Sequence, residues 1–130
     1  MMRERRRQPA EWEMHEACWV AWPSHSELWG EALEPVRRAF VEMCSAIGGA
    51  GRREGAAPAE RLRICVLDER GESEARHWLA ALEGLSFVRL PFGDIWLRDT
   101  APLFVRDENG VSWAACLRFN GWGGKYRLPG

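Results

Sequence analysis

Between two short apolar runs, the chain reads Gly93-Asp94-Ile95-Trp96-Leu97-Arg98-Asp99-Thr100-Ala101-Pro102. These ten residues hold two carboxylates, one guanidinium and one indole. Gly93 permits backbone angles that other residues avoid, and Pro102 favours an extended conformation at the residue before it. The flanking runs, Phe87–Leu90 and Leu103–Val105, are typical of strands. The stretch is therefore predicted to be a fixed loop between two strands, of the kind that presents reactive side chains.

Two arrangements of the side chains in this loop are open. In an extended segment, Asp94 and Trp96 share a face and Asp99 points away. In a turn, Trp96 and Asp99, three residues apart, come to the same side. An indole face beside a carboxylate is a good receptor for a flat cation, because it combines cation–π contact with charge-assisted hydrogen bonds. The alternative, equally open from the residues alone, is that Trp96 belongs to the core and Asp99 pairs with Arg98 or caps a nearby element.

Strand-like segments lie on both sides of this loop. Apolar or alternating sequences predict strands at Ala17–Trp22, Leu62–Val66 and Phe87–Leu90, and a hairpin of Leu103–Arg106 with Val111–Phe119. The turn of the hairpin is predicted at Asp107–Gly110, where Asn109-Gly110 suits a tight turn.

Two helices are predicted between the strands. The first begins at Pro35, a residue favoured at the first helical position, and ends at Gly48-Gly49. The second is capped by Ser73 and closed by Gly84. Their apolar faces are Val36, Phe40, Met43, Cys44 and Ile47 in the first, and Ala75, Trp78, Leu79 and Leu82 in the second. Residues 48–60 are predicted to be a surface loop. Strands alternating with helices predict an α/β architecture with some parallel pairing.

The composition limits the classes of function. At 130 residues, of which 46% are apolar, the chain fits one ordinary domain. A formal charge of −1 gives no electrostatic reason to expect nucleic acid or a membrane surface as a partner. Residues 1–8, which include Arg3-Glu4-Arg5-Arg6-Arg7, are predicted to be a short solvated basic tail. No apolar run approaches the ~20 residues needed to span a bilayer, so a cytosolic protein is expected.

The cysteines and histidines show neither a disulfide pattern nor a metal-binding one. Each cysteine lies in an apolar segment without a C-x-x-C pair, which predicts buried, reduced thiols. The histidines show no ligand spacing to one another, so no metal site is expected. The residues concerned are Cys18, Cys44, Cys65 and Cys116, and His15, His25 and His77. Eight tryptophans are an unusual number, and some are expected at a ligand site, where an apolar ring also makes a polar contact.

Three motifs resemble those of a known family. They are Pro9–Glu13 with His15-Glu16 and Trp19–Pro23, the stretch Gly93–Pro102, and Phe119-Asn120-Gly121-Trp122-Gly123-Gly124-Lys125-Tyr126. In this order they resemble the agmatine deiminases and bacterial peptidyl-arginine deiminases of the guanidino-group-modifying, or pentein, superfamily. The resemblance implies a partial α/β propeller, in which residues 9–130 supply the first ββαβ modules of a five-module fold. It also leads us to expect a chain truncated after the Gly-rich motif, since a propeller with missing modules leaves sheet edges unpaired.

The resemblance further implies a reaction and its residues. Agmatine and water would give N-carbamoylputrescine and ammonia, a step of putrescine and polyamine biosynthesis. In the family, the Asp of the W-x-R-D motif binds the substrate guanidinium and the Trp three residues earlier lines the pocket, which correspond to Asp99 and Trp96 here. A cysteine attacks, ammonia leaves, and water releases the product from a covalent amidino-cysteine intermediate. No metal or organic cofactor takes part.

The family's nucleophilic cysteine and catalytic histidine would lie beyond residue 130. None of the four cysteines here matches the nucleophile, and Cys116, in a strand-like segment, is expected to be structural. His15 is expected to be a hydrogen-bonded structural histidine. The chain alone is therefore expected to have no deiminase activity.

The remaining motif residues leave alternatives open. Asp94 binds substrate or orients the loop, and orientation is favoured. Arg98 is expected to hold a neighbouring carboxylate, Asp94 or Asp99, in place. The Gly-rich motif forms part of the pocket wall or only a tight turn after a strand. Its candidate substrate-binding residues are Asn120, Trp122, Gly123 and Gly124.

Two other functions are compatible with these residues. One is a peptidyl-arginine or other arginine-type deiminase, which shares the guanidinium chemistry but recognises a different tail. The other is a non-catalytic module that binds a guanidinium or amine through Trp96 and Asp99. The expected partner is a small-molecule guanidine such as agmatine, and a homo-oligomer remains open.

Overall fold

The computed structural model describes residues 5–49 and 59–125, and these residues form two compact units. We call them the α/β unit (residues 15–97) and the hairpin unit (residues 5–14 and 98–125). All the apolar side chains that are buried in the described residues belong to the α/β unit.

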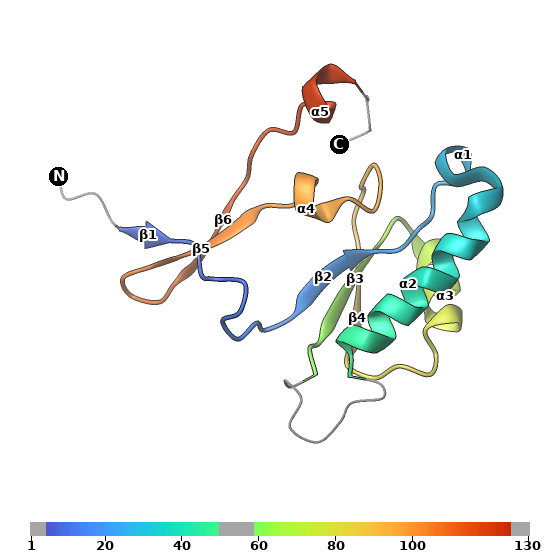
Figure 1. The fold of residues 1–130 in the computed structure, drawn as a ribbon, viewed down its shortest axis with the longest axis horizontal. Helices are drawn as coiled ribbons and strands as arrows, with labels where there is room; N and C mark the ends of the chain where they lie inside the picture. Colours follow the sequence, from blue (N-terminus) through green and yellow to red (C-terminus); the bar gives the residue numbers. More distant parts are fainter. Residues whose placement is uncertain (1–4, 50–58, 126–130) are drawn as a thin grey trace. The chain divides into compact units, whose positions relative to one another are not determined.

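The α/β unit is built on a parallel sheet in the order β2-β3-β4 (Figure 1). Its strands are β2 (Cys18–Ala21), β3 (Leu62–Val66) and β4 (Leu85–Arg89). The crossovers contain α2 (Leu33–Ile47) and α3 (Glu69–Trp78), and α1 (Ser26–Trp29) and the 3-10 turn η1 (Gly30–Ala32) precede α2. The predicted alternation of strands and helices is confirmed, and so is the parallel pairing.

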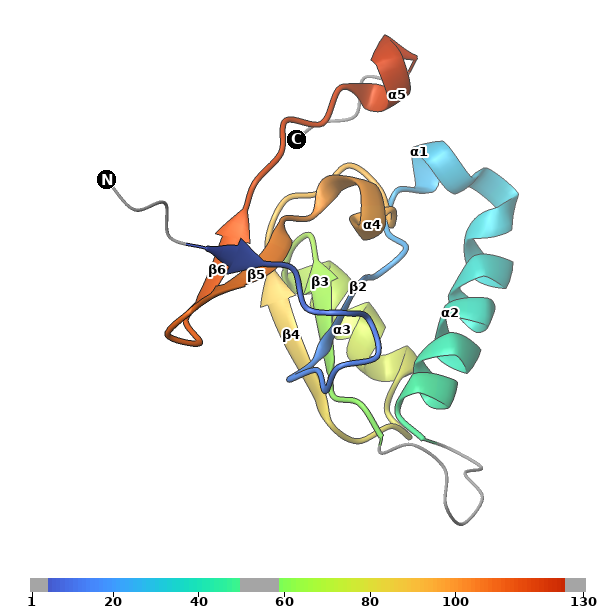
Figure 2. The same cartoon turned by 60° about the vertical axis from the view of Figure 1, so that its left-hand side comes forward.

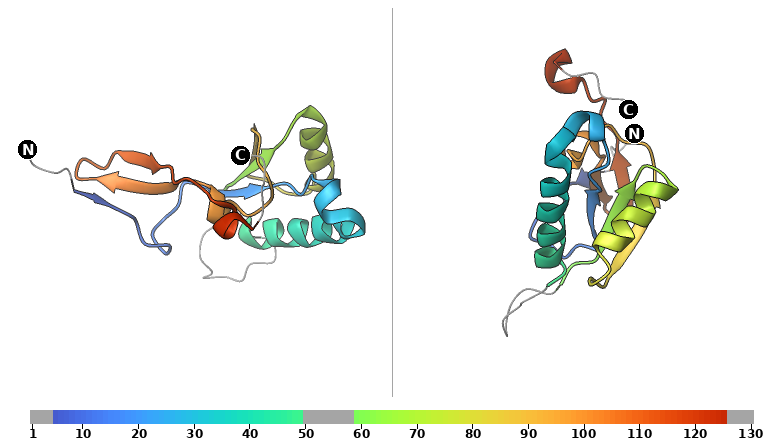
Figure 3. Two further views of the ribbon diagram at one scale, coloured as in Figure 1. Left: turned by 90° about the horizontal axis from the view of Figure 1, so that it is seen from above. Right: turned by 90° about the vertical axis from the view of Figure 1, so that its right-hand side faces the viewer.

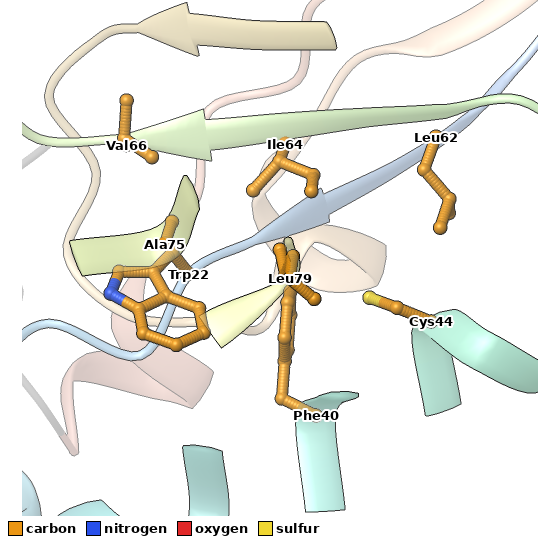
Figure 4. Packing of buried hydrophobic residues seen from close by; sticks show 8 residues of the cluster. All are labelled: Trp22, Phe40, Cys44, Leu62, Ile64, Val66, Ala75 and Leu79. Carbon is orange, nitrogen blue, oxygen red and sulfur yellow. The ribbon is translucent and has the colours of Figure 1, made fainter. Parts of the chain in front are cut away.

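Helices α2 and α3 cover the same face of this sheet (Figure 2). Each crossover steps by one strand in the same direction, and crossovers of one hand then place both helices on one face. Alternate residues of β3 point to that face, as the period of a strand requires. Figure 4 shows the resulting core of Trp22, Phe40, Cys44, Leu62, Ile64, Val66, Ala75 and Leu79. As predicted, Phe40, Cys44 and Ile47 of α2 and Ala75 and Trp78 of α3 lie in this core or pack against it, as do Leu79 and Leu82 just after the end of α3. Val36 is half-buried outside the cluster, and Met43 is 43% exposed.

The opposite face of the sheet is covered by the segment that follows β4. Ala21 of β2 and Cys65 of β3 are buried with Phe92 in a second apolar cluster. Leu90 and Leu97 pack against the same cluster. Burial of these side chains anchors both ends of the segment that carries Asp94 and Trp96.

Two helix starts differ from prediction. Helix α2 begins at Leu33, so Pro35 is its third residue, still in the first turn where an N–H has no intrahelical partner. The prediction that Ser73 caps the second helix is wrong, because Ser73 lies one turn inside α3. The cap is Asp68, whose Oδ1 accepts the Gly71 N–H at 2.8 Å. Residues 50–58 of the predicted surface loop lie outside the described residues.

The hairpin unit contains an antiparallel sheet in the order β1-β5-β6, seen in the left view of Figure 3. Its strands are β1 (Arg6–Arg7), β5 (Leu103–Asp107) and β6 (Ser112–Ala115), and two helical turns are α4 (Leu97–Thr100) and α5 (Gly121–Gly124). The predicted hairpin is confirmed, but β6 ends at Ala115 rather than Phe119. Within the described residues β6 pairs only with β5, so no other strand prolongs β6 beyond Ala115.

The N-terminal segment also differs from prediction. Arg6 and Arg7 form a strand paired with Asp107 and Arg106, rather than a wholly solvated tail. The edge of β5 offers unpaired backbone groups, and β1 satisfies them while both arginine side chains stay exposed. None of the helices in the described part of the chain is long and apolar enough to cross a bilayer.

Candidate functional site

The Gly93–Pro102 stretch is divided between the two units: residues up to Leu97 belong to the α/β unit and those from Arg98 to the hairpin unit. Its backbone makes one helical turn, α4, over Leu97–Thr100. The predicted loop is therefore turned, not extended, in its second half.

Asp94 is held by two hydrogen bonds within the α/β unit. Its Oδ1 accepts the indole N–H of Trp29 at 3.2 Å and the backbone N–H of Ile95 at 2.8 Å. A carboxylate that bonds the next peptide unit fixes the backbone around it, as in an Asx turn. This geometry fits the favoured role for Asp94, which is to orient the loop.

Trp29 was missed by the sequence reasoning. It ends the one-turn helix α1 and is followed by Gly30, whose φ of 49° and ψ of −128° suit glycine alone. A second contact between the same segments is the edge-to-face packing of the His25 and Phe92 rings, with centroids 5.7 Å apart. The sequence signals for Trp29 were the excess of tryptophan and a tryptophan directly before a glycine.

Trp96 is 48% exposed and belongs to neither buried apolar cluster. Trp96 is therefore not a core residue in this structure.

Asp99 and Trp122 bring two of the motifs together in the hairpin unit. The indole N–H of Trp122 donates to Asp99 Oδ1 at 3.4 Å, a long hydrogen bond between exposed groups. The Trp122 ring also packs edge-to-face on Phe119, with centroids 5.0 Å apart. Trp122 has a φ of 53°, a left-handed conformation that is costly for a bulky residue. Strained backbone of this kind clusters at ligand-binding sites.

The Gly-rich motif forms a tight turn. Asn120 Oδ1 accepts the backbone N–H of Gly123 at 2.9 Å and so caps α5. Gly123 and Gly124 have φ of 78° and 80°. Of the two possibilities left open for these residues, the tight turn is the one that the structure contains. The same turn brings the indole N–H of Trp122 to Asp99.

Arg98 does not have the partner that was expected. Its guanidinium donates to Glu11 Oε1 at 2.9 Å, rather than to Asp94 or Asp99. This hydrogen bond raises the pKa of Arg98, and the charge of Asp99 adds a smaller effect in the same direction. Glu11 belongs to the N-terminal motif and is in the hairpin unit. Residues of all three motifs therefore meet in that unit: Glu11, Arg98, Asp99 and Trp122.

The thiols differ in their surroundings. Cys44 and Cys65 are buried as predicted, and burial raises their pKa to about 12 and about 11. Cys18 is half-buried, and burial again raises its pKa. The prediction of burial is wrong for Cys116, which is exposed, as are most residues of the strand β6 that precedes it. All four are free thiols.

His15 is a hydrogen-bonded histidine, as predicted, with its Nδ1 3.2 Å from Glu60 Oε2. The pair is exposed, and it links the segment before β2 to the segment before β3. Within residues 5–49 and 59–125, no three His, Cys, Asp or Glu side chains gather closely enough to hold a metal ion.

Comparison with known proteins gives consistent matches. Residues 7–129 match the family described as Porphyromonas-type peptidyl-arginine deiminase. The agmatine deiminase of Stutzerimonas stutzeri is 33% identical over 122 residues, and that of Pseudomonas aeruginosa (strain LESB58) is 33% identical over 118 residues. These matches cover 90% and 91% of this chain but 29% of each relative. The chain thus spans about three tenths of the length of these relatives.

Solved structures share the fold. A substrate-bound agmatine deiminase of C. jejuni, in which a cysteine is replaced by serine, has a TM-score of 0.78 at 17% identity, over 97% of this chain and 34% of that chain. A second C. jejuni agmatine deiminase structure has a TM-score of 0.71 at 14% identity, over 94% of this chain and 36% of that chain. At these identities the likeness establishes the fold alone, the mixed α/β organisation of the penteins. With the sequence match over residues 7–129, it follows that the chain belongs to the family of the Porphyromonas-type peptidyl-arginine deiminases and agmatine deiminases.

Proposed function

We propose that this chain is the guanidinium-binding part of an agmatine deiminase-type hydrolase, which converts agmatine and water to N-carbamoylputrescine and ammonia. Asp99 would accept a pair of guanidinium N–H groups, and Trp96 would line the pocket around the planar cation. Bidentate pairing orients the guanidinium carbon as well as attracting the cation. A cysteine thiolate would then attack that carbon to give an amidino-cysteine intermediate.

The observation that carries this proposal is the meeting of the three motifs in the hairpin unit. Arg98 bonds Glu11 at 2.9 Å, so the guanidinium beside Asp99 already has a carboxylate partner of its own. Asp99 is exposed and receives a long hydrogen bond of 3.4 Å from Trp122. Because a carboxylate has about four lone-pair sites, Asp99 keeps acceptor capacity for a substrate guanidinium.

The nucleophile is proposed to be none of the four cysteines of this chain. A nucleophilic cysteine needs a thiolate, which a lowered pKa favours. Burial instead raises the pKa of Cys18, Cys44 and Cys65, which keeps them as thiols at neutral pH. Cys116 is exposed but does not match the family's nucleophile in sequence. We also propose that residues 9–130 supply the first modules of the pentein propeller, and that the free thiols reflect a reducing, cytosolic compartment.

Titration with agmatine and with putrescine tests the guanidinium-binding proposal. Putrescine has the amine tail of agmatine without the guanidinium, so it is a matched control. We expect calorimetry to detect agmatine at an affinity at least tenfold above that for putrescine, about 1.4 kcal/mol. Equal affinities would instead support a non-catalytic amine-binding module.

Incubation of the pure chain with agmatine tests the assignment of the cysteines. We expect no release of ammonia above the level without protein. Steady release of ammonia that disappears in Cys116→Ser would show that Cys116 is a nucleophile and that the assignment is wrong.

A peptidyl-arginine deiminase is the second candidate, and the family match favours it specifically. It would use the same guanidinium chemistry on an arginine within a peptide. Titration with acetyl-arginine amide, which carries a peptide-like backbone in place of the amine tail, separates the two candidates. Tighter binding of acetyl-arginine amide than of agmatine would favour this second function.

A further inference from the structure

Two loops meet at the carboxyl end of the parallel sheet, although their strands are not neighbours. Strands β2 and β4 lie on either side of β3, yet the loop after β2 contacts the loop after β4. The contacts are the Trp29 to Asp94 hydrogen bond of 3.2 Å and the ring packing of His25 on Phe92. In open α/β sheets, this end of the strands is where ligands bind.

The backbone around Trp29 fixes the direction of its indole. Helix α1 is one turn long, and both Leu28 and Trp29 donate their backbone N–H to the carbonyl of His25, at 3.1 Å each. Gly30 then reverses the chain with a positive φ of 49°. A side chain at Gly30 would meet no atom within 4 Å, so this glycine is needed for its backbone angles and not for space.

The Trp29 indole acts on a single oxygen of Asp94. That oxygen, Oδ1, also accepts the Ile95 N–H at 2.8 Å. Trp29 therefore holds the carboxylate in the rotamer that bonds Ile95, and the Asp94–Ile95 peptide unit is fixed as a result. Phe92, packed on His25 and buried with Cys65, anchors the same loop two residues earlier.

We infer that Trp29 is a positioning residue for the guanidine-recognition loop. It acts through Asp94 to fix the Asp94–Ile95 peptide unit, one residue before Trp96 is reached, and it makes no contact with the guanidine itself. The assignment of guanidine as the ligand rests on the proposed function, whereas the effect of Trp29 on the Ile95 peptide does not.

The test uses the full chain in three variants, Trp29→Phe, Asp94→Ala and the double variant. Trp29→Phe keeps an aromatic ring but removes the N–H donor. Loss of one hydrogen bond should speed amide hydrogen exchange at Ile95 by roughly fivefold or more. Agmatine affinity should fall by a similar factor, with the melting temperature little changed. The double variant should be no worse than Asp94→Ala, because residues that act through one another are not additive.

Trp113→Phe is the matched control. Trp113 also donates its indole N–H to an aspartate, Asp107, at 2.9 Å, but it lies on β6 of the hairpin unit. We expect this variant to leave the exchange rate at Ile95 unchanged. If Trp29→Phe fails to fold, the indole N–H resonance of Trp29 in Asp94→Ala replaces it as a readout, and it should move by comparison with the parent chain.

The outcomes separate this inference from the proposed function. Faster exchange at Ile95 without any agmatine binding by the parent chain would support the role of Trp29 and refute the proposed function. Unchanged exchange at Ile95 in Trp29→Phe, or an unmoved Trp29 resonance in Asp94→Ala, would refute the role of Trp29. Additive losses of affinity in the double variant would likewise refute it.

Discussion

Asp94 and Asp99 stand five residues apart in one motif, yet they have different hydrogen-bond partners, and we propose different roles for them. Asp94 uses one oxygen for both the Trp29 indole and the Ile95 peptide. Asp99 is exposed and accepts a 3.4 Å hydrogen bond from Trp122. A carboxylate engaged with its own loop orients that loop, whereas one with acceptor capacity to spare can take a cation.

Replacement of each carboxylate by its amide should therefore have unequal effects on agmatine binding. Asp99→Asn keeps the shape and one acceptor oxygen but removes the charge. Hydrogen bonds to charged groups contribute about 1.5–3 kcal/mol each, so losing such a pair should weaken binding by tens-fold or more. Asp94→Asn should cost less, because an amide oxygen can still accept from Ile95. Calorimetry on both variants measures the difference, and a larger loss in Asp94→Asn would reverse the two assignments.

Glu13, in the N-terminal motif, provides a pH-dependent test of the hairpin unit. Both oxygens of its carboxylate bond the Arg7 guanidinium, at 2.6 and 3.0 Å, and Oε1 also accepts the Ala10 N–H at 3.0 Å. The bond to Arg7 is the main reason that the pKa of Glu13 falls to about 2 from an ordinary value of 4.5. A depressed pKa means that this carboxylate stabilises the fold fully above pH 4.5, and that its contribution is lost as the pH falls towards 2.

Arg7→Gln should raise the pKa of Glu13 towards 4.5, because the hydrogen bond to Arg7 is the largest cause of its lowering, while the Ala10 bond remains. Titration of the Glu13 carboxyl carbon by NMR measures this directly. Arg5→Gln is the control, since Arg5 has the same charge but does not bond Glu13. An equal rise of the Glu13 pKa in both variants would mean that general charge, and not the Arg7 pair, lowers it.

At the scale of elements, periodic apolar patterns were sufficient to predict the strands and helices, but single-residue signals were not sufficient to predict where they begin and end. The alternation of Leu62, Ile64 and Val66 predicted β3 and the face that packs against the two helices, but Cys65 on the other face is buried too. Ser73 was wrongly predicted to be the cap of α3. Whether Ser73 or Asp68 caps this helix depends on where β3 ends, and neither residue by itself indicates that position. The end of β6 was wrong for a similar reason, since a strand extends only as far as it has a partner.

Long-range contacts could not be predicted at all from single residues. Trp29 and Asp94 are 65 positions apart, and nothing in either local sequence indicates the other. Glu11 and Arg98 are 87 positions apart, and Arg98 had two nearer carboxylates in its own motif. In both pairs, the partner is set by the order of the strands and not by the motif.

The cap of α3 can be tested separately from the rest of the fold. Asp68→Ala removes the acceptor of the Gly71 N–H and should lower the free energy of unfolding by about 1 kcal/mol. Ser73→Ala, at an exposed position inside the helix, should change it by less than about 0.5 kcal/mol. Urea unfolding followed by circular dichroism measures both, and a greater loss for Ser73→Ala would restore the original prediction.

At the scale of the whole molecule, the hairpin unit exposes many large apolar side chains. Seven of them in the described residues are at least 41% exposed: Trp12, Met14, Phe104, Val111, Trp113, Leu117 and Trp122. Strand β6 also has one edge that pairs with no strand of the described residues. Exposed apolar patches and open edges are sites of association.

We therefore expect the chain to self-associate at micromolar concentrations. Size-exclusion chromatography with light scattering should show a mass above that of the monomer, rising with protein concentration. Leu117→Lys, on the 72% exposed Leu117, should shift the population towards monomer, whereas the α/β-unit variant Leu28→Lys should not. A monomer at all concentrations would contradict this expectation.

The hairpin unit is made of two pieces of chain, with the whole α/β unit between them. When Arg6 pairs with Asp107, it closes a loop of roughly 100 residues, and the entropy lost in closing a flexible loop grows with its length. Once residues 15–97 have folded, the two ends of the inserted segment are held at a fixed separation, and most of that entropy has already been lost. Assembly is therefore hierarchical. The α/β unit can fold as it leaves the ribosome, whereas β1 can pair only after β5 has been made. Melting of the α/β unit should therefore unfold the hairpin unit, but melting of the hairpin unit should leave the α/β unit folded.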